Sequence, residues 1–172
     1  MFEIETNRLL LRKFRPGDED DVFEFGSDEQ CCLDDGGYHA FTEKNEDFFD
    51  HFETICQQDR YAIVLKSENK VIGVIHLMDA NRAVPSYELG FLLNAKYHRN
   101  GYCFEAAQAV IREYFDKTDT QMFIAGHFPH NTASRNLLHK LGFIYEGSVH
   151  NAVNHATLGL VDIAYYYKEK ST

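Results

Sequence analysis

Residues 87–106 combine an apolar strand pattern, a short polar loop and the start of a helix, and they have the clearest chemical potential in the sequence. Gly101 lies where the helix begins, and Lys96 and Arg99 precede it. Helix N-termini have unpaired backbone amides and the positive end of the helix dipole, which suit a phosphate or pyrophosphate. Glycine lets the backbone approach such an anion closely, but it is also the usual residue of an ordinary turn. The segment therefore predicts either an anion site or a plain turn.

Other motifs that would indicate chemistry are absent. The sequence contains neither GxxxxGK[ST] nor GxGxxG, so neither common nucleotide-phosphate loop is present. The nine histidines show no HxxxH or HExxH spacing, and Cys31, Cys32, Cys56 and Cys103 form no CxxC pair. We therefore expect no metal, and free or structural thiols in place of disulfides.

Length and composition limit the classes of protein that fit. The 172 residues, 44% of them hydrophobic, are expected to form a single domain over residues 1–172. No stretch approaches the roughly 20 apolar residues of a membrane span, and residues 1–6 do not resemble a secretory signal, so we expect a cytoplasmic protein that binds no membrane. The formal charge of -10 argues against nucleic-acid binding and suits a cationic partner.

Apolar periodicity indicates an α/β (α+β) fold around the loop. Strands are expected at residues 8–12, 61–66, 71–78, 87–93, 122–127, 143–149 and 158–167. Helices are expected after an Asp18 cap, from a Thr42 cap to about Cys56, at 101–115, and from an Asn131 or Thr132 cap to a stop at Gly142. Residues 26–41 lack periodicity and are expected to be a loop. The strand, helix and strand at 87–127 predict a parallel crossover within a mostly antiparallel sheet.

Three segments together resemble the GCN5-related N-acetyltransferases (GNAT), especially the RimJ/RimL-type branch that acetylates ribosomal-protein N-termini. Residues 5–12 resemble the ETxRLxLR start of that branch. Residues 88–106 are similar to its E-x-G-(Y/F)-x-L and G-Y-A-x-E-A block, and residues 131–143 to its N-x-x-S-x-x-(V/L)-x-x-K-L-G-F segment. The resemblance spans nearly the whole chain, and the three blocks occur in the right order.

The resemblance implies the GNAT fold, with a mixed sheet of about seven strands, a central βαβ unit and helices on both faces. It also implies acetyl-CoA as cosubstrate and direct attack by a primary amine in a ternary complex. The amine would be a protein N-terminal α-amine or a small-molecule amine, and the protein a monomer or homodimer. Two departures stand out: His98 and Cys103 replace the first and last residues of the family's (Q/R)-x-x-G-x-(G/A) loop, and Leu138 occupies the position of its acid tyrosine.

The same resemblance assigns the cosubstrate site. It implies that the strand backbone at Phe91, Leu92 and Leu93 holds the acetyl and pantetheine groups, that the loop cradles the pyrophosphate, and that the helix after residue 130 contacts the pantetheine and adenine ends. The loop residues are His98, Arg99, Asn100, Gly101, Tyr102, Cys103 and Phe104, and the helix residues are Asn131 and Asn136, with Arg135 nearby.

Two side chains are candidate catalytic residues. Glu88 alternates onto the strand face of Gly90 and Leu92 and is the candidate general base, acting through water; the alternative is an exposed or salt-bridged glutamate. Ser134 occupies the place where this branch often has a serine near the sulfur; the alternative is simple helix packing.

The acceptor walls are expected on either side of the thioester. One is the segment with Asp28, Glu29, Asp34 and Asp35, which is either a cation-attracting wall or a solvated acidic loop. The other is the hairpin at 149–159, which contains His150 and His155. A non-catalytic acyl-CoA-binding module on the same fold is the alternative to an enzyme; in it, Glu88 would be dispensable.

Overall fold

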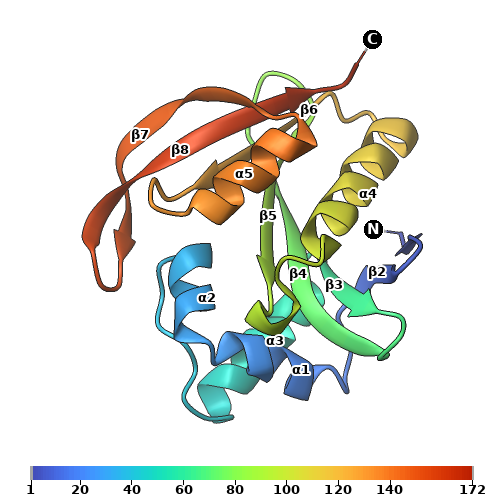
Figure 1. Ribbon diagram of the computed structural model, residues 1–172, viewed down its shortest axis with the longest axis vertical. Coiled ribbons are helices and arrows are strands. Elements are labelled where there is room, and N and C mark those ends of the chain that lie inside the picture. The colour runs from blue at the N-terminus through green and yellow to red at the C-terminus, as the bar shows by residue number, and fades with distance from the viewer. Residues whose placement is uncertain (1, 172) are drawn as a thin grey trace.

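The computed structural model describes residues 2–171, which contain one eight-stranded sheet (Figure 1). In spatial order the strands are β1 (Ile4–Glu5), β2 (Leu9–Lys13), β3 (Arg60–Leu65), β4 (Lys70–Asp79), β5 (Ser86–Leu93), β6 (Met122–His127), β8 (Gly159–Glu169) and β7 (Ile144–His155). Neighbouring strands are antiparallel except β5 and β6, which are parallel. The mixed sheet and its parallel crossover are confirmed, and β1 is the strand that periodicity did not reveal.

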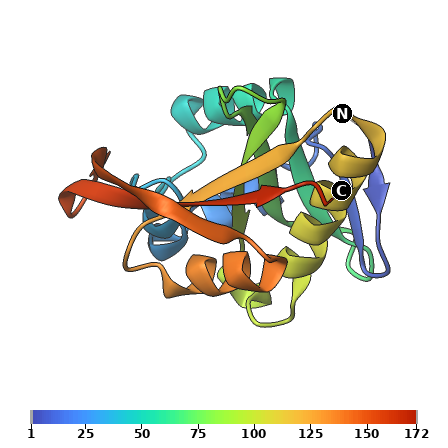
Figure 2. The same cartoon turned by 90° about the horizontal axis from the view of Figure 1, so that it is seen from above.

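Helices cover both faces of the sheet (Figures 1 and 2). On one face α4 (Tyr102–Lys117) and α5 (Thr132–Leu141) enclose the larger core, which includes Leu89 and Phe123. On the other face α1 (Glu19–Gly26), α2 (Glu29–Asp35) and α3 (Glu46–Gln57) enclose a second core, which includes Phe48 and Leu92. Successive residues of β5 thus contribute to opposite cores, as strand alternation requires. None of the helices within the described part is long and apolar enough to cross a membrane.

Helix α2 corrects the expectation of a loop over residues 26–41. The Asp28 carboxylate accepts a hydrogen bond from the Cys31 backbone N–H at 3.0 Å, which satisfies a free amide of the first turn. Cys31 and Cys32 are both buried, so the vicinal pair anchors the helix to the molecule. Seven residues are too few for a helical period to be recognised in the sequence.

One predicted cap was wrong, and the other is at the expected position without a cap hydrogen bond from its side chain. Helix α3 is capped by Asn45, whose side chain accepts from the Phe48 N–H at 3.1 Å, and not by Thr42. Phe49 of the same helix is 46% exposed. Asp18 does precede α1, but its carboxylate makes no cap hydrogen bond. It pairs instead with Arg12 of β2 through two hydrogen bonds of 2.7 and 2.8 Å.

The Arg12–Asp18 pair is the basis of a stability prediction. Both residues are 5% exposed, so removing one partner leaves a buried charge without compensation. We expect Asp18→Ala to lower the free energy of unfolding by about 3–5 kcal/mol in urea titrations. Asp59→Ala, which breaks the exposed Lys13–Asp59 pair, is the control and should cost at most about 1 kcal/mol. Equal losses in the two variants would contradict the prediction.

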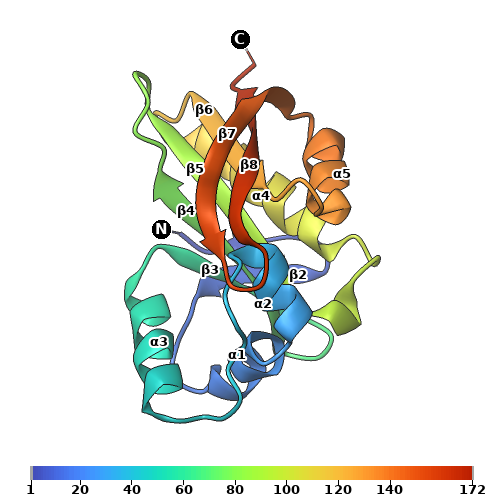
Figure 3. The ribbon, with the colours of Figure 1, turned by 90° about the vertical axis from the view of Figure 1, so that its left-hand side faces the viewer.

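The β7–β8 hairpin is longer than the sequence suggested, and its tip lies against the segment after α2 (Figure 3). The Ala156 N–H donates to the Gly37 carbonyl at 2.7 Å. His155 is buried beside Gly37, where an added Cβ would lie 3.0 Å from the imidazole Cδ2. The two walls that the sequence analysis assigned to the acceptor are therefore in direct contact with each other.

Candidate active site

The parallel strands β5 and β6 separate after a short paired stretch. Only Ser86–Glu88 pairs with Met122–Ile124, although β5 continues to Leu93 and β6 to His127. A gap between neighbouring strands leaves backbone N–H and C=O groups without ladder partners, and such groups can bind an extended ligand. The separation begins at Glu88, the candidate base.

Backbone alternation shows which residues face the gap. Asn94 donates its N–H to the Ile72 carbonyl at 2.8 Å, on the β4 side of the chain. Peptide groups alternate along a strand, so the polar backbone groups of Leu92 also face β4, while those of Phe91 and Leu93 face the gap. Among the three strand residues assigned to the cosubstrate, Phe91 and Leu93 therefore present their amides to it, and Leu92 contributes a buried side chain.

The His98 side chain lies at the end of β5. Its Nε2 is 2.8 Å from the Leu93 carbonyl oxygen, so the imidazole N–H donates to that carbonyl. Cys31 Sγ lies 3.8 Å from the same oxygen. His98 thus joins the loop to the strand, and its ring is directed to Leu93 and not to the backbone cradle.

The loop before α4 has the conformation of an anion-binding helix start. Gly101 is the N-cap residue with φ 78°, and Arg99 has φ 63°, so both lie in the left-handed region. This conformation is costly for residues with a Cβ and is readily adopted by glycine. The N–H groups of the first turn, which begins at Tyr102, lack helical partners and lie at the positive end of the α4 dipole.

Arg8 braces this loop, a role that the sequence analysis missed. Its Nη1 donates to the Asn100 carbonyl at 3.0 Å, and its guanidinium lies 4.4 Å from the centre of the Tyr102 ring. Glu105 holds Arg8 in place by accepting from its Nε at 2.7 Å and also accepts from Thr6 Oγ1 at 2.6 Å. Thr6 and Arg8 belong to the ETxRLxLR segment. This motif was the sequence feature that could have indicated a role for Arg8.

Lys96, which precedes the loop, is paired with a residue of α1. Its Nζ lies 2.8 Å from Glu24 on α1, which also pairs with Lys70 at 2.6 Å. Hydrogen bonds from Lys70, Lys96 and Asn94 lower the pKa of Glu24 to about 2. Lys96 therefore fastens the loop to α1, and Arg99, which is exposed, is the cation within the loop itself.

Two further side chains of the loop segment, Cys103 and Phe104, pack as apolar groups. Burial raises the pKa of the Cys103 thiol to about 12, so this residue is a neutral packing group at neutral pH. The Phe104 ring lies 4.3 Å from Lys140 Nζ of α5, which connects the two helices beside the loop.

The start of α5 is tied to α2. Asn131 caps α5 by accepting from the Ser134 N–H at 3.0 Å, and its amide nitrogen donates to the Asp34 carbonyl at 3.1 Å. Both ends of this side chain are thus engaged in the fold. Ser134 is half-buried, Asn136 is exposed on the same helix, and Leu138 is fully buried beneath it.

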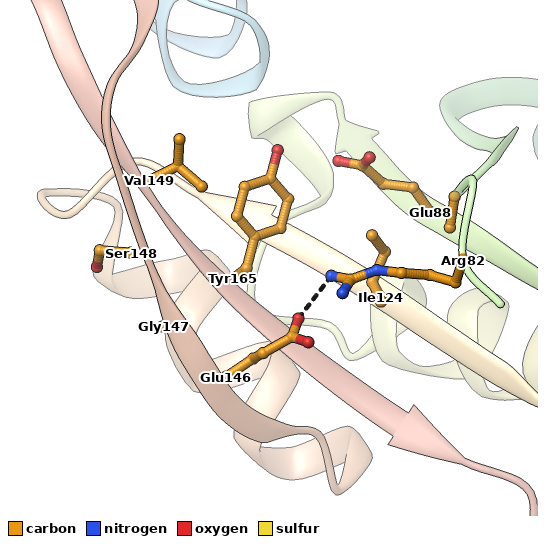
Figure 4. Close-up of a pocket in the computed structure, with 9 residues that line it drawn as sticks. Arg82, Glu88, Ile124, Glu146, Gly147, Ser148, Val149 and Tyr165 are labelled. Carbon is orange, nitrogen blue, oxygen red and sulfur yellow. Dashed lines mark hydrogen bonds and ion pairs between the residues drawn. The ribbon is translucent and has the colours of Figure 1, made fainter.

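A cavity of about 370 Å³ opens where β5 and β6 separate, on the face of the sheet that carries Glu88 (Figure 4). Its lining includes Glu88, Ile124, Tyr165 and an ion pair in which Arg82 Nη2 lies 2.8 Å from Glu146 Oε2. This pair joins the β4–β5 connection to β7 across the cavity. Burial raises the pKa of Glu88, and the positive charge of Arg82 opposes the rise.

The acidic residues near position 30 have structural partners. Asp28 caps α2, and Glu29 accepts from the Ala40 N–H at 2.7 Å. Asp35 accepts from the Tyr38 hydroxyl at 3.1 Å, and burial raises the pKa of Asp35 to about 6. Three of the four carboxylates are therefore used to build α2 and the segment after it. His150 and His155, on the hairpin, do not line the cavity that contains Glu88.

These features define an acyltransferase of the GNAT type: two parallel strands that separate, a left-handed glycine before a helix, and a carboxylate where the strands part. Residues 8–144 match the acetyltransferase (GNAT) domain family, and the chain belongs to this family. Members of the family transfer acetyl groups to amines.

Individual relatives agree with this assignment. The N-acetyltransferase YnaD of Bacillus subtilis is 30% identical over 146 residues, which cover 84% of each chain. The crystal structure of a GNAT-family acetyltransferase from Bacillus anthracis superimposes with a TM-score of 0.87 at 30% identity, over 98% of this chain and 99% of the other. The ribosomal protein uS5-alanine N-acetyltransferase of Escherichia coli is 35% identical over 82 residues, 46% of this chain and 42% of its own.

Proposed function

We propose that the protein is an acetyl-CoA-dependent N-acetyltransferase that acetylates a primary amine by direct attack in a ternary complex. One observation carries the proposal: the β5–β6 gap opens at Glu88, so a half-buried carboxylate lies where an extended thioester entering the gap would end. A module that only binds acyl-CoA has no need of a carboxylate at this place.

The backbone supplies the groups that hold the cosubstrate. The N–H groups from the first turn of α4 bind the diphosphate, with the helix dipole and Arg99 providing positive potential in an acidic protein. The N–H groups of Phe91 and Leu93, which face the gap, hold the pantetheine arm and the acetyl carbonyl oxygen. A fixed donor of this kind stabilises the oxyanion of the tetrahedral intermediate by about 3–4 kcal/mol in other enzymes.

Glu88 takes the proton that prevents attack. The ammonium loses one proton to the carboxylate, through water, and the free amine attacks the carbonyl carbon. The C–N bond forms, the C–S bond then breaks, and the second nitrogen proton passes to the coenzyme A thiolate to give the thiol. Ser134, on the first turn of α5, is the group we assign to hydrogen-bond the departing sulfur.

The acceptor occupies the cavity beside Glu88. Its two carboxylates and one guanidinium leave a net negative charge, which suits a monocationic ammonium group. Its volume suits a small amine or the first residues of a peptide. Because a relative is a ribosomal protein uS5-alanine N-acetyltransferase, a peptide that begins with alanine is the first acceptor to test.

The test combines a binding and a turnover measurement. Calorimetry measures coenzyme A binding, and a thiol reagent measures coenzyme A release from acetyl-CoA with an alanine-first peptide, spermidine and small aromatic amines. Amine-dependent release supports the proposal. Tight binding without release for any amine would instead support the acyl-CoA-binding module, and no binding at all would reject both.

Arg82 provides a pH prediction for this mechanism. Glu88 accepts a proton only as a carboxylate, so its raised pKa places the acid limb of the kcat/KM profile above the ordinary range of glutamate. Arg82→Met removes the charge that lowers this pKa, and the limb should move to higher pH. Arg112→Met on α4, remote from the cavity, is the control and should leave the profile in place. A shift to lower pH in Arg82→Met would contradict the assignment.

A further inference from the structure

The imidazole of His76 lies directly over Gly90. The two residues are paired across β4 and β5, and a Cβ built at position 90 would lie 1.6 Å from His76 Nε2. The backbone of Gly90 is not in the left-handed region, so conformation does not explain the glycine. The lack of space explains the glycine, because any side chain at position 90 would displace the imidazole ring.

This position places the ring beside the candidate base. Glu88, Gly90 and Leu92 share one face of β5, and Glu88 is paired with Met78, two residues after His76 on β4. Diagonal neighbours of this kind in an antiparallel pair lie within reach of long side chains. The imidazole therefore lies over Gly90, the next position after Glu88 on the same face of β5, and just outside the set of residues that line the cavity.

The ring is neutral at physiological pH. Burial, assisted by the positive charge of Arg60, lowers the pKa of His76 to about 4. Arg60 is paired with His76 on β3, so the three residues Arg60, His76 and Gly90 form one row across the sheet. A neutral imidazole has one N–H donor and one lone pair. Its Nδ1 is buried and has no hydrogen-bond partner among residues 2–171.

We propose that His76 is a positioning residue for the acceptor amine. The neutral ring exchanges one hydrogen bond with the acceptor amine, or with the water that links this amine to Glu88, and so directs the nitrogen lone pair toward the thioester in the gap. His76 takes no proton in this role, because the proton goes to Glu88. The inference deepens the proposed function and rests on it.

The first test substitutes the ring alone. We expect His76→Leu to reduce kcat/KM for the acceptor on the order of 100-fold, because misplacing a reacting group costs about this much. Coenzyme A affinity and thermal stability should stay near wild type. His76→Gln, which keeps a neutral donor and acceptor, should recover most of the rate. His51→Leu is the matched control, because burial also lowers the pKa of this histidine but the residue lies on α3. The acetylation rate of the His51→Leu variant should be unchanged.

The second test separates positioning from packing. Gly90→Ala should displace the ring and reduce the rate as His76→Leu does. The double variant His76→Ala with Gly90→Ala removes the imidazole, so the methyl group at position 90 no longer clashes with it. Folding and coenzyme A binding should then recover, while the acetylation rate stays low. If the rate recovers with the stability, the role is packing and the proposal is overturned.

The two proposals fail in different ways. A wild type that binds coenzyme A but acetylates none of the amines overturns the proposed function, and the role of His76 with it. A wild type that is active, together with a His76→Leu variant of equal activity, overturns only the role of His76.

Discussion

Glu88→Gln should reduce kcat/KM for the acceptor amine by about 100- to 10,000-fold, the usual contribution of a general base. Glutamine keeps the size and hydrogen-bonding capacity of the side chain but cannot take a proton from the ammonium. Because the cosubstrate contacts lie in the loop and along the gap-facing edge of β5, coenzyme A affinity should stay unchanged. Steady-state acetylation rates and calorimetry measure the two quantities.

The pH dependence sharpens this result. An α-amine has a pKa of about 8, so a growing fraction of the acceptor is already deprotonated as the pH rises. Above that pH, the loss of kcat/KM in Glu88→Gln relative to wild type should become smaller. Glu146→Gln is the matched control, since Glu146 lines the same cavity but is paired with Arg82. It should lose far less activity than Glu88→Gln, because it keeps the base and removes only part of the negative charge that attracts the ammonium group. A Glu88→Gln variant as active as the Glu146→Gln control would falsify the assignment of the base.

The second large effect concerns Gly101. Gly101→Val should weaken coenzyme A binding by about 10- to 100-fold, because a β-branched residue strained in the left-handed region costs about 1–3 kcal/mol. The backbone relieves this strain by turning its amides away from the diphosphate. Calorimetric titration with coenzyme A measures the loss, and thermal melting shows whether the fold is intact.

A second substitution isolates the conformational cause. A Cβ at position 101 meets only Arg8 Nη2, at 3.6 Å, so the site has room for a side chain. Asparagine tolerates the left-handed region better than other residues with a Cβ, so Gly101→Asn should bind coenzyme A far more tightly than Gly101→Val. Equal affinities would show that the left-handed backbone at this position does not form the anion site.

Helices and strands long enough to show a full period of hydrophobic residues were predicted from the sequence. Strand β6 is found at Met122–His127 as expected, and α4 and α5 differ from expectation by only a few residues at their ends. Features without a full period were not predicted correctly: α2, which has only seven residues, was missed, and the cap of α3 was misplaced from Asn45 to Thr42. Several residues in each segment could serve as a cap, and the tertiary contacts select one.

The site was predictable where one segment contains its chemistry. Glu88 and Gly101 were named because strand alternation and a helix start are local patterns. Arg8 and the Arg82–Glu146 pair escaped notice, because each acts on a segment far along the chain. His76 escaped too, since its importance depends on its pairing with Gly90 across β4 and β5.

By itself the sequence determined the periodic elements, the order of the three family segments, and the residue types that could bind a diphosphate or take a proton. Only the tertiary structure decided how far β5 and β6 stay paired, that Lys96 pairs with Glu24, and that an imidazole covers Gly90. The physical reason is the range of the forces involved. Backbone geometry and amphipathic periodicity act between near neighbours in the chain, whereas the separation of strands and the packing over a glycine follow from how all eight strands fit together.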